Sequence, residues 1–305
     1  MTATDTAQPA PSEPMRDPAG RGGLVDVFRR RYLLKLLVRK EVKVRYQGSL
    51  LGMGWSYIQP MMRFVVYYVI IGIVLQMNRS VPNFAVHIVA GMTLVHFFSE
   101  TFGSTTRSVV KNKSLVRKVG LPREMFPVAA TLVSAVNIIP GFVILFSAAL
   151  LTGWHPTADL VPAALLGFAL VGVWGFGLGL LFSAFNVYYR DFSKVVQVVT
   201  MLLPWSTPMI YPFSRVAEAF AGRAWWALEL YLANPVSVAV MLFQEAFWLP
   251  TVDDRGLSRP GEYDALDMAP HLYERGLILL AVGLVVVWFA QKAFSRLESS
   301  FAEQL

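Results

Sequence analysis

The sequence predicts an all-α membrane protein with six membrane-spanning helices, and three observations support that fold class. Of the 305 residues, 55% are hydrophobic and only 15% are charged, whereas soluble domains average about 25% charged residues. Apolar stretches of about 20 residues, the length that crosses a bilayer, occur six times. Lys and Arg gather between alternate stretches, as they do on the cytoplasmic side of membrane proteins.

The N-terminal region is predicted to precede the bundle in two parts. Residues 1–22 hold four prolines among small and polar residues, which is typical of a disordered tail and lacks the apolar core of a secretory signal. Residues 23–48 alternate eight cations with apolar side chains. This pattern favours an amphipathic interface helix on the cytoplasmic leaflet; a solvated or calmodulin-binding helix is the alternative.

The six predicted spans differ in length, and a seventh apolar region does not fit a simple span. The predicted spans are 57–77, 85–107, 124–151, 160–185, 195–213 and 274–292. Residues 215–249 are aromatic and apolar but are interrupted at Asn234 and Pro235. We expect two short re-entrant helices there, on the extracytoplasmic side. The polar, acidic stretch 253–267 is predicted to be an exposed loop.

The distribution of cations predicts that both termini are cytoplasmic. Cations are dense before the first span, in the loop 107–123, around Arg190 and Lys194, and in the tail after residue 291. The loops on the opposite side carry few. The net charge of +7 is therefore explained by topology and anionic lipid, and no nucleic-acid partner is expected.

No catalytic or metal-binding motif is found in the sequence. It contains no G-x-x-x-x-G-K-[ST] phosphate loop, no H-E-x-x-H, no G-x-S-x-G and no cysteine. His96 and Glu100 stand four residues apart on a predicted helix, but two ligands are too few for a zinc site. We therefore expect no catalytic residue, metal or cofactor in this chain.

Two charged residues fall inside the predicted spans. Arg63 and Glu100 are expected at similar depth in neighbouring helices. Intramembrane charges usually have a function or a partner, so we predict that these two side chains pair. The alternative is that Arg63 extends to the interface while Glu100 faces water.

Aromatic side chains gather at the first and fifth spans. They are Trp55, Tyr57, Phe64, Tyr67, Tyr68, Trp205 and Tyr211. Aromatic faces stack on the C–H faces of sugar rings, which favours a sugar conduit, although an interfacial aromatic belt would have the same composition. The basic stretch 108–119 is predicted to form one short cytoplasmic helix that contacts a motor protein, or else serves only as a topology signal.

Six segments in order resemble the membrane subunits of type-2 ATP-binding-cassette exporters for polysaccharides. They are RYQGSLLGMGWSYIQP (45–60), NKSLVRKVGLPREMFPVA (112–129), FNVYYRDFSKVV (185–196), TPMIYP (207–212), ANPVSVAV (233–240) and FSRLESSFAEQL (294–305). Together the resemblance covers about residues 25–305.

The resemblance implies partners and roles for particular residues. Two copies of the chain would enclose a conduit for a lipid-linked polysaccharide, and two copies of a separate ATPase would bind ATP and Mg²⁺. Residues 24–45 would be the interface helix and gate, and the aromatic residues above would line the conduit. The expected lipid-diphosphate contacts are Arg29, Arg30, Arg31 and Arg45. The expected ATPase-docking residues are Lys111, Asn112, Lys113, Leu115, Val116, Arg117, Lys118, Tyr189, Arg190, Asp191 and Phe192.

Other functions are less well supported by the residues. A drug or small-lipid exporter would share the fold. An ion-coupled transporter usually has several acidic groups at mid-membrane, and a membrane-embedded enzyme needs convergent acids or histidines. The Ala-, Val- and Arg-rich composition is typical of a GC-rich genome, which favours a cell-wall galactan precursor among the cargoes, although no residue identifies galactose.

Overall fold

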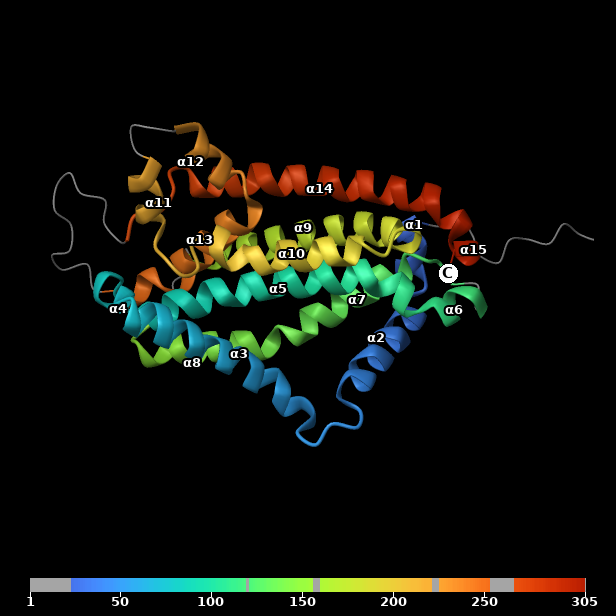
Figure 1. The fold of residues 1–305 in the computed structure, drawn as a ribbon, viewed down its shortest axis with the longest axis horizontal. Helices are drawn as coiled ribbons and strands as arrows, with labels where there is room; N and C mark the ends of the chain where they lie inside the picture. The colour runs from blue at the N-terminus through green and yellow to red at the C-terminus, as the bar shows by residue number, and fades with distance from the viewer. Residues whose placement is uncertain (1–22, 119–120, 156–159, 221–224, 253–265, 305) are drawn as a thin grey trace, which may run out of the picture.

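The computed structural model describes residues 23–118, 121–155, 160–220, 225–252 and 266–304. Within these ranges the chain is a helical bundle without strands (Figure 1). The N-terminal half contains α1 (Gly23–Arg29), α2 (Arg31–Tyr46), α3 (Trp55–Tyr67), α4 (Met77–Ser80), α5 (Phe84–Lys111), α6 (Lys113–Lys118), α7 (Met125–Asn137) and α8 (Ile139–Leu151). The C-terminal half contains α9 (Leu160–Tyr188), α10 (Phe192–Ser206), α11 (Phe213–Phe220), α12 (Trp225–Leu232), α13 (Pro235–Phe247), α14 (Leu272–Leu297) and α15 (Phe301–Gln304).

Among the described residues, five helical segments are long and apolar enough to cross a membrane. They are Gly52–Val74, Phe84–Lys111, Met125–Leu151, Leu160–Tyr188 and Leu272–Ser300. The first combines a short 3₁₀ turn (Gly52–Gly54), α3 and a π-helical stretch (Tyr68–Val74), and the third combines α7 and α8. These segments confirm the all-α membrane class and match five of the predicted spans.

The predicted span 195–213 is represented by a shorter helix. α10 has 15 residues, which is about 22 Å at 1.5 Å per residue and shorter than a full crossing. The helix ends at Ser206 because Thr207 is extended, as residues before proline prefer to be. A sixth crossing is also available from α12 with residues 235–251, which are bent by 77°. The count of six spans stays a prediction.

The remaining predictions about the fold differ in detail. The interface helix is two helices, α1 and α2, separated at Arg30. The apolar region 215–249 forms three short helices, α11 to α13, instead of two. The predicted disordered tail 1–22 and most of the acidic loop 253–267 lie outside the described residues.

The core is built around α5, which packs against α7, α8, α9, α10 and α13. In its most apolar stretch 78% of the residues are buried inside the chain, against 11% for Gly52–Val74. Close approach to α9 depends on small residues: a Cβ added at Gly179 would lie 2.6 Å from Thr105 Cβ. Small residues at such contacts are a common means of packing helices in membranes. α5 is therefore the buried centre, and the first span is peripheral.

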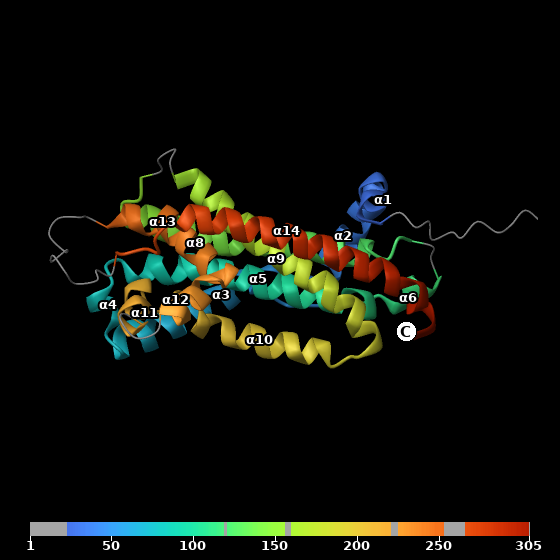
Figure 2. The ribbon, with the colours of Figure 1, turned by 90° about the horizontal axis from the view of Figure 1, so that it is seen from above.

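The two ends of the bundle are distinct. α1, α6 and α15 lie at one end, and α4 and α11 lie at the other (Figure 1). Viewed from above, α10 runs apart from the layer formed by α9 and α14 (Figure 2). α2 and α3 form a V whose tip projects from the middle of the bundle, and its α2 arm leads toward the end that carries α6 (Figure 1). One side of α5 is left uncovered between α3 and α10, where a cavity lies.

Candidate functional site: an open groove along α5

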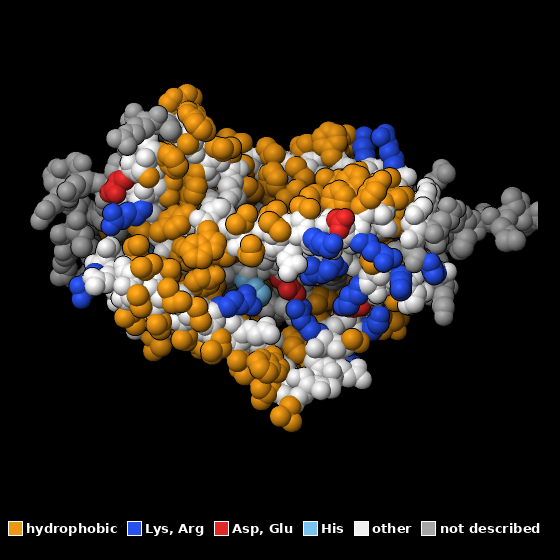
Figure 3. All heavy atoms as spheres, viewed as in Figure 1, with side chains coloured by type: hydrophobic (Ala, Val, Ile, Leu, Met, Phe, Trp, Pro, Cys, Tyr) orange, Lys and Arg blue, Asp and Glu red, His pale blue; other side chains and the backbone are white. Residues whose placement is uncertain are grey.

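The uncovered side of α5 is a groove that two adjoining cavities form. One, of about 490 Å³, lies between the end of α2, α3 and α5. The other, of about 330 Å³, lies between α3, α5 and α10. Both are lined by Arg63 and His96, so we treat them as one feature, the open groove. Figure 3 shows the hollow, in which basic, acidic and histidine side chains lie together between hydrophobic surfaces.

The walls of the open groove combine aromatic and polar side chains. α3 contributes Trp55, Gln59 and its last residue, Tyr67, to these walls. α10 contributes Gln197 and Thr200. Hydroxyls and amides offer hydrogen bonds in both directions, while aromatic faces offer apolar contact. This lining is suited to an elongated ligand that is rich in hydroxyl groups.

Two polar contacts cross the floor of the open groove. Arg45 Nη1 lies 2.7 Å from Glu100 Oε1 and forms an ion pair with it. Arg63 Nη1 lies 2.8 Å from His96 Nδ1. His96 and Glu100 do face the same way on α5, as their spacing predicts. These contacts connect the V of α2 and α3 to the central helix.

The predicted ion pair between Arg63 and Glu100 is wrong. No contact within ion-pair distance joins these two side chains in the described residues, because α2 brings Arg45 against Glu100 first. Arg63 instead contacts His96, which lies one turn before Glu100 on α5. The sequence placed both charges in neighbouring helices but gave no sign that α2 would return to α5.

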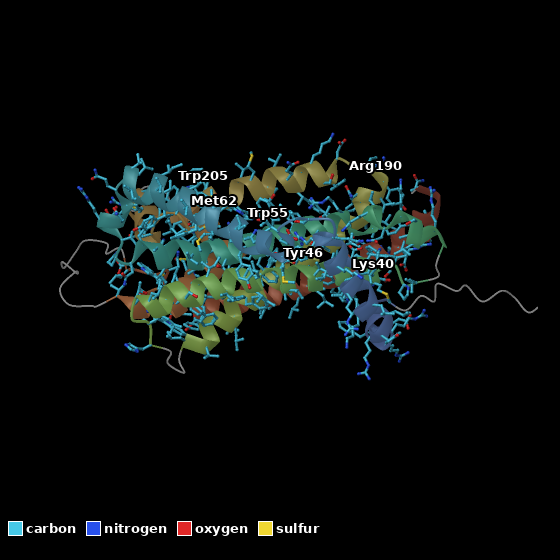
Figure 4. The ribbon with its side chains drawn as sticks, turned by 90° about the horizontal axis from the view of Figure 1, so that it is seen from below. Lys40, Tyr46, Trp55, Met62, Arg190 and Trp205 are labelled. Atoms are coloured by element: carbon cyan, nitrogen blue, oxygen red, sulfur yellow. The ribbon has the colours of Figure 1, made fainter. Side chains whose placement is uncertain are left out.

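The predicted conduit aromatics divide into two groups. Trp55 and Tyr67 line the open groove, and Tyr57 and Trp205 are exposed. The rings of Phe64 and Tyr68 instead pack against each other, with centroids 5.5 Å apart, and Tyr68 also packs against Phe84 of the core. The Tyr211 hydroxyl donates to the Trp205 carbonyl at 2.8 Å. In Figure 4, Trp205 and Met62 lie toward one end of this face, and Lys40 and Arg190 lie toward the other, with Trp55 and Tyr46 between them.

The predicted docking residues gather at the end of the bundle that carries α6, but not all are accessible. Lys113, Arg117, Tyr189, Arg190 and Asp191 are exposed. Asn112 and Val116 are buried, Leu115 is half-buried, and Phe192 stacks on Phe185 with centroids 5.3 Å apart. The side chain of Lys118 lies outside the described set.

The predicted helix 108–119 is also corrected. α5 runs through Lys111, and a separate helix of six residues follows from Lys113. The break falls at Asn112, whose side-chain amide donates to the Ser108 carbonyl at 3.0 Å and so closes the end of α5. Asparagine satisfies helix-end carbonyls in this way and favours a break over continuation.

A second link joins this docking end to α2. Lys111 Nζ lies 2.6 Å from Glu41 Oε2, and Lys40 Nζ reaches the side chain of Asn112 at 3.5 Å. Burial alone would raise the pKa of Glu41, but the hydrogen bond and charge of Lys111, with the charge of Lys40, lower it below 4.5. Glu41 is therefore a carboxylate at neutral pH, and it attaches α2 to the start of the docking segment.

The cations expected to meet a lipid diphosphate have different surroundings. Arg29 and Arg31 are exposed. Arg30 pairs with Asp26 at 3.2 Å, and Arg45 is taken by Glu100. Two of the four are thus neutralised within the chain.

Comparison with known proteins agrees with this architecture. The family model described as ABC-2 type transporter matches residues 32–248. The chain is 25% identical over 276 residues to the O-antigen export system permease protein RfbA of Klebsiella pneumoniae, covering 90% of this chain and 95% of that protein. It is also 25% identical over 282 residues to the protein of the same name in Myxococcus xanthus, covering 92% and 98%.

A more distant relative is the polysialic acid transport protein KpsM of Escherichia coli. It is 20% identical over 227 residues, covering 74% of this chain and 84% of that protein. The family match spans more than half of the chain and includes α2, the open groove and α13. The chain belongs to the ABC-2 type transporter family of membrane proteins.

Proposed function

We propose that the chain is the membrane-spanning subunit of an ATP-driven exporter that carries a lipid-linked polysaccharide across the cytoplasmic membrane. The observation that carries the proposal is the open groove, with its aromatic and hydroxyl- or amide-bearing walls along a buried central helix. The relatives named above are permeases of O-antigen export and a polysialic acid transport protein. A galactan precursor stays one candidate cargo.

ATP hydrolysis would be the task of a separate ATPase. The sequence has no phosphate-loop motif, so ATP and Mg²⁺ would bind to that partner. We assign its docking surface to the exposed side chains of α6 and of the turn between α9 and α10, namely Lys113, Arg117, Tyr189, Arg190 and Asp191. Both elements present polar groups at the same end of the bundle.

The conduit would be completed by a second copy of the chain. The open groove has no cover on one side, and the helices beside it expose large apolar side chains. Met62 on α3 is 57% exposed, and Met201 and Trp205 on α10 are 65% and 59% exposed. A symmetric pair, with an ATPase on each subunit, would place two grooves face to face.

The proposed mechanism transmits ATPase closure through the docking end to the groove. Lys111 lies next to α6 and holds Glu41 of α2. One turn further along α2, Arg45 holds Glu100 at the floor of the groove. A shift of α6 would therefore move α2, and with it the contact that closes the groove at this end. We place this end, with α1 and α15, on the cytoplasmic side, since its cations favour that side.

A tagged pull-down from native membranes in mild detergent tests the proposal. We expect a stoichiometric partner with a phosphate-loop ATPase sequence, and a bound glycolipid whose glycan identifies the cargo. The charge-reversed double variant Arg117→Glu/Arg190→Glu should lose the ATPase but keep the glycolipid. Recovery of a monodisperse chain with no ATPase, or of small lipids without glycan, would contradict the proposal.

A further inference from the structure

A third cavity, separate from the open groove, lies between α2, α5 and α7. It encloses about 360 Å³, and we call it the inner cavity. It shares only Arg45 and Glu100 with the open groove. Their ion pair is therefore a partition between the two spaces.

The inner cavity has a polar wall, a mixed wall and an apolar wall. α5 contributes a polar face with helical spacing, made of Glu100, Ser104, Arg107, Ser108 and Lys111. α2 contributes a mixed wall made of Leu37, Glu41, Val44 and Arg45. The α7 wall is apolar and is made of Phe126, Ala129, Ala130 and Val133. A space of this kind fits an amphiphile, with its head on α5 and its chain against α7.

In the described residues, one cation that lines the inner cavity has no carboxylate within ion-pair distance. Lys111 is bound by Glu41 at 2.6 Å, and Arg45 is bound by Glu100 at 2.7 Å. In the described part of the chain, Arg107 has neither a hydrogen bond nor an ion pair with another side chain. Its guanidinium keeps all its donors in a geometry that matches phosphate oxygens.

The neighbouring hydroxyls do not compete for this role. Ser108 Oγ donates to the Thr105 carbonyl at 2.7 Å, and Ser104 Oγ lies 2.9 Å from Ser134 Oγ. Arg107 also lies only four residues, or about 6 Å, before the end of α5 at Lys111. It is thus placed near the depth of lipid headgroups on the side where α6 begins.

We propose that the inner cavity binds the phosphate of a lipid, with Arg107 as the ligand of the phosphate and the α7 wall in contact with the hydrocarbon chain. The lipid would be either an anionic phospholipid of the bilayer or the prenyl diphosphate that anchors the cargo. Only the second source rests on the proposed function. In both cases Arg107 of α5, which is itself exposed, is the main phosphate contact in place of the cations of α1 and α2.

Native mass spectrometry of the full-length chain in detergent tests this site without requiring export or an ATPase. The probes are phosphatidylglycerol, farnesyl diphosphate and, as the uncharged-headgroup control, phosphatidylcholine. Arg107→Gln is compared with Arg39→Gln, which removes the same charge from an exposed position of α2 that does not line the cavity. Ala130→Phe fills the apolar side of the cavity and leaves every charge in place.

We expect Arg107→Gln to weaken binding of one anionic probe by at least about tenfold, the size of a lost charge-assisted hydrogen bond. Ala130→Phe should give a similar loss, and Arg39→Gln should stay within about twofold of the unmodified chain. If Arg107→Gln weakens the binding of phosphatidylglycerol, the natural ligand is a bilayer lipid. If it weakens the binding of farnesyl diphosphate, the natural ligand is the carrier lipid. Equal binding of both probes by Arg107→Gln and Arg39→Gln would overturn the proposal.

Discussion

The half of the molecule formed by α5, α9, α13 and α14 differs sharply from the half formed by α2, α3 and α10. In the first, which we call the packed half, aromatic rings and small residues fill the space between helices; Trp248, for example, is 1% exposed and donates to the Pro82 carbonyl at 2.7 Å. In the second, the open half, charged side chains border cavities and large apolar residues are exposed.

This difference separates stability from function. In the packed half, α5 and α13 bury most of their side chains within the chain, and the exposed face of α14 is apolar surface that suits contact with lipid. The open half leaves apolar surface and cavities that only lipid, cargo or another subunit can cover. Substitutions in the packed half should therefore change stability most, and substitutions in the open half should change assembly and transport with little effect on folding.

The largest expected effect compares two tryptophans. Trp248→Ala should lower the free energy of unfolding by about 3–5 kcal/mol, because it removes a fully buried ring and leaves a cavity. Trp205→Ala, at a position 59% exposed on α10, should change it by less than about 1 kcal/mol. Reversible unfolding in mixed micelles measures both. Equal losses at the two positions would remove the distinction between the halves.

The next effect concerns close packing of α9 on α5. Gly179→Ala should destabilise the fold by about 1–3 kcal/mol, since the added Cβ would lie 2.6 Å from Thr105 Cβ. Gly172→Ala is the matched control in the same helix, because its nearest neighbour would be Phe97 at 3.8 Å. The control should be neutral or slightly stabilising. Thermal denaturation in detergent distinguishes them, and two similar shifts would argue against tight packing here.

A smaller effect tests the ion pair that separates the two cavities. In a double-mutant cycle, Arg45→Ala and Glu100→Ala should show a coupling energy of about 1 kcal/mol. Arg63→Ala and Glu100→Ala should show little, because Arg63 contacts His96 instead. Glu100→Gln should reduce export while the protein remains folded. A stronger coupling for Arg63 than for Arg45 would contradict the observed pairing.

The smallest effect is a pH dependence within the open half. The lowered pKa of Glu41, which arises because Lys111 and Lys40 outweigh the opposing effect of burial, means that the folded state binds this proton less readily than the unfolded state. Its contribution to stability is present above about pH 4.5 and is lost as pH falls below that value. Glu41→Gln should remove this contribution, so that the melting temperature changes less with pH in that range. If the dependence of melting temperature on pH were the same in Glu41→Gln and the unmodified chain, the contact would not affect folding.

The sequence predicted the long apolar helices better than the short elements and the contacts between distant segments. Apolar runs of sufficient length overlap the five candidate membrane-crossing segments, with ends that differ by up to eight residues, because burial in lipid depends on local composition. The end of α5 at Asn112 and the short α10 were missed, since single capping and turn residues decide them.

Pairing between distant segments could not be predicted. From the sequence alone, several cations were possible partners of Glu100. Arg45 is its partner because α2 returns toward α5 in the fold. Arg107 likewise belonged to a basic loop in the sequence, where it resembled its neighbours. The structure distinguishes it because Glu41 and Glu100 are occupied by other partners.

Cross-linking of single-cysteine variants tests most directly whether the open half meets a second copy of the chain. The natural sequence has no cysteine, so Met62→Cys on α3 and Ile278→Cys on α14 each introduce one thiol, at positions 57% and 63% exposed. Treatment of native membranes with a short bismaleimide should give a covalent dimer for Met62→Cys and none for Ile278→Cys. A conduit formed by two facing grooves would be contradicted if only Ile278→Cys gave a dimer, or if no dimer formed with either variant.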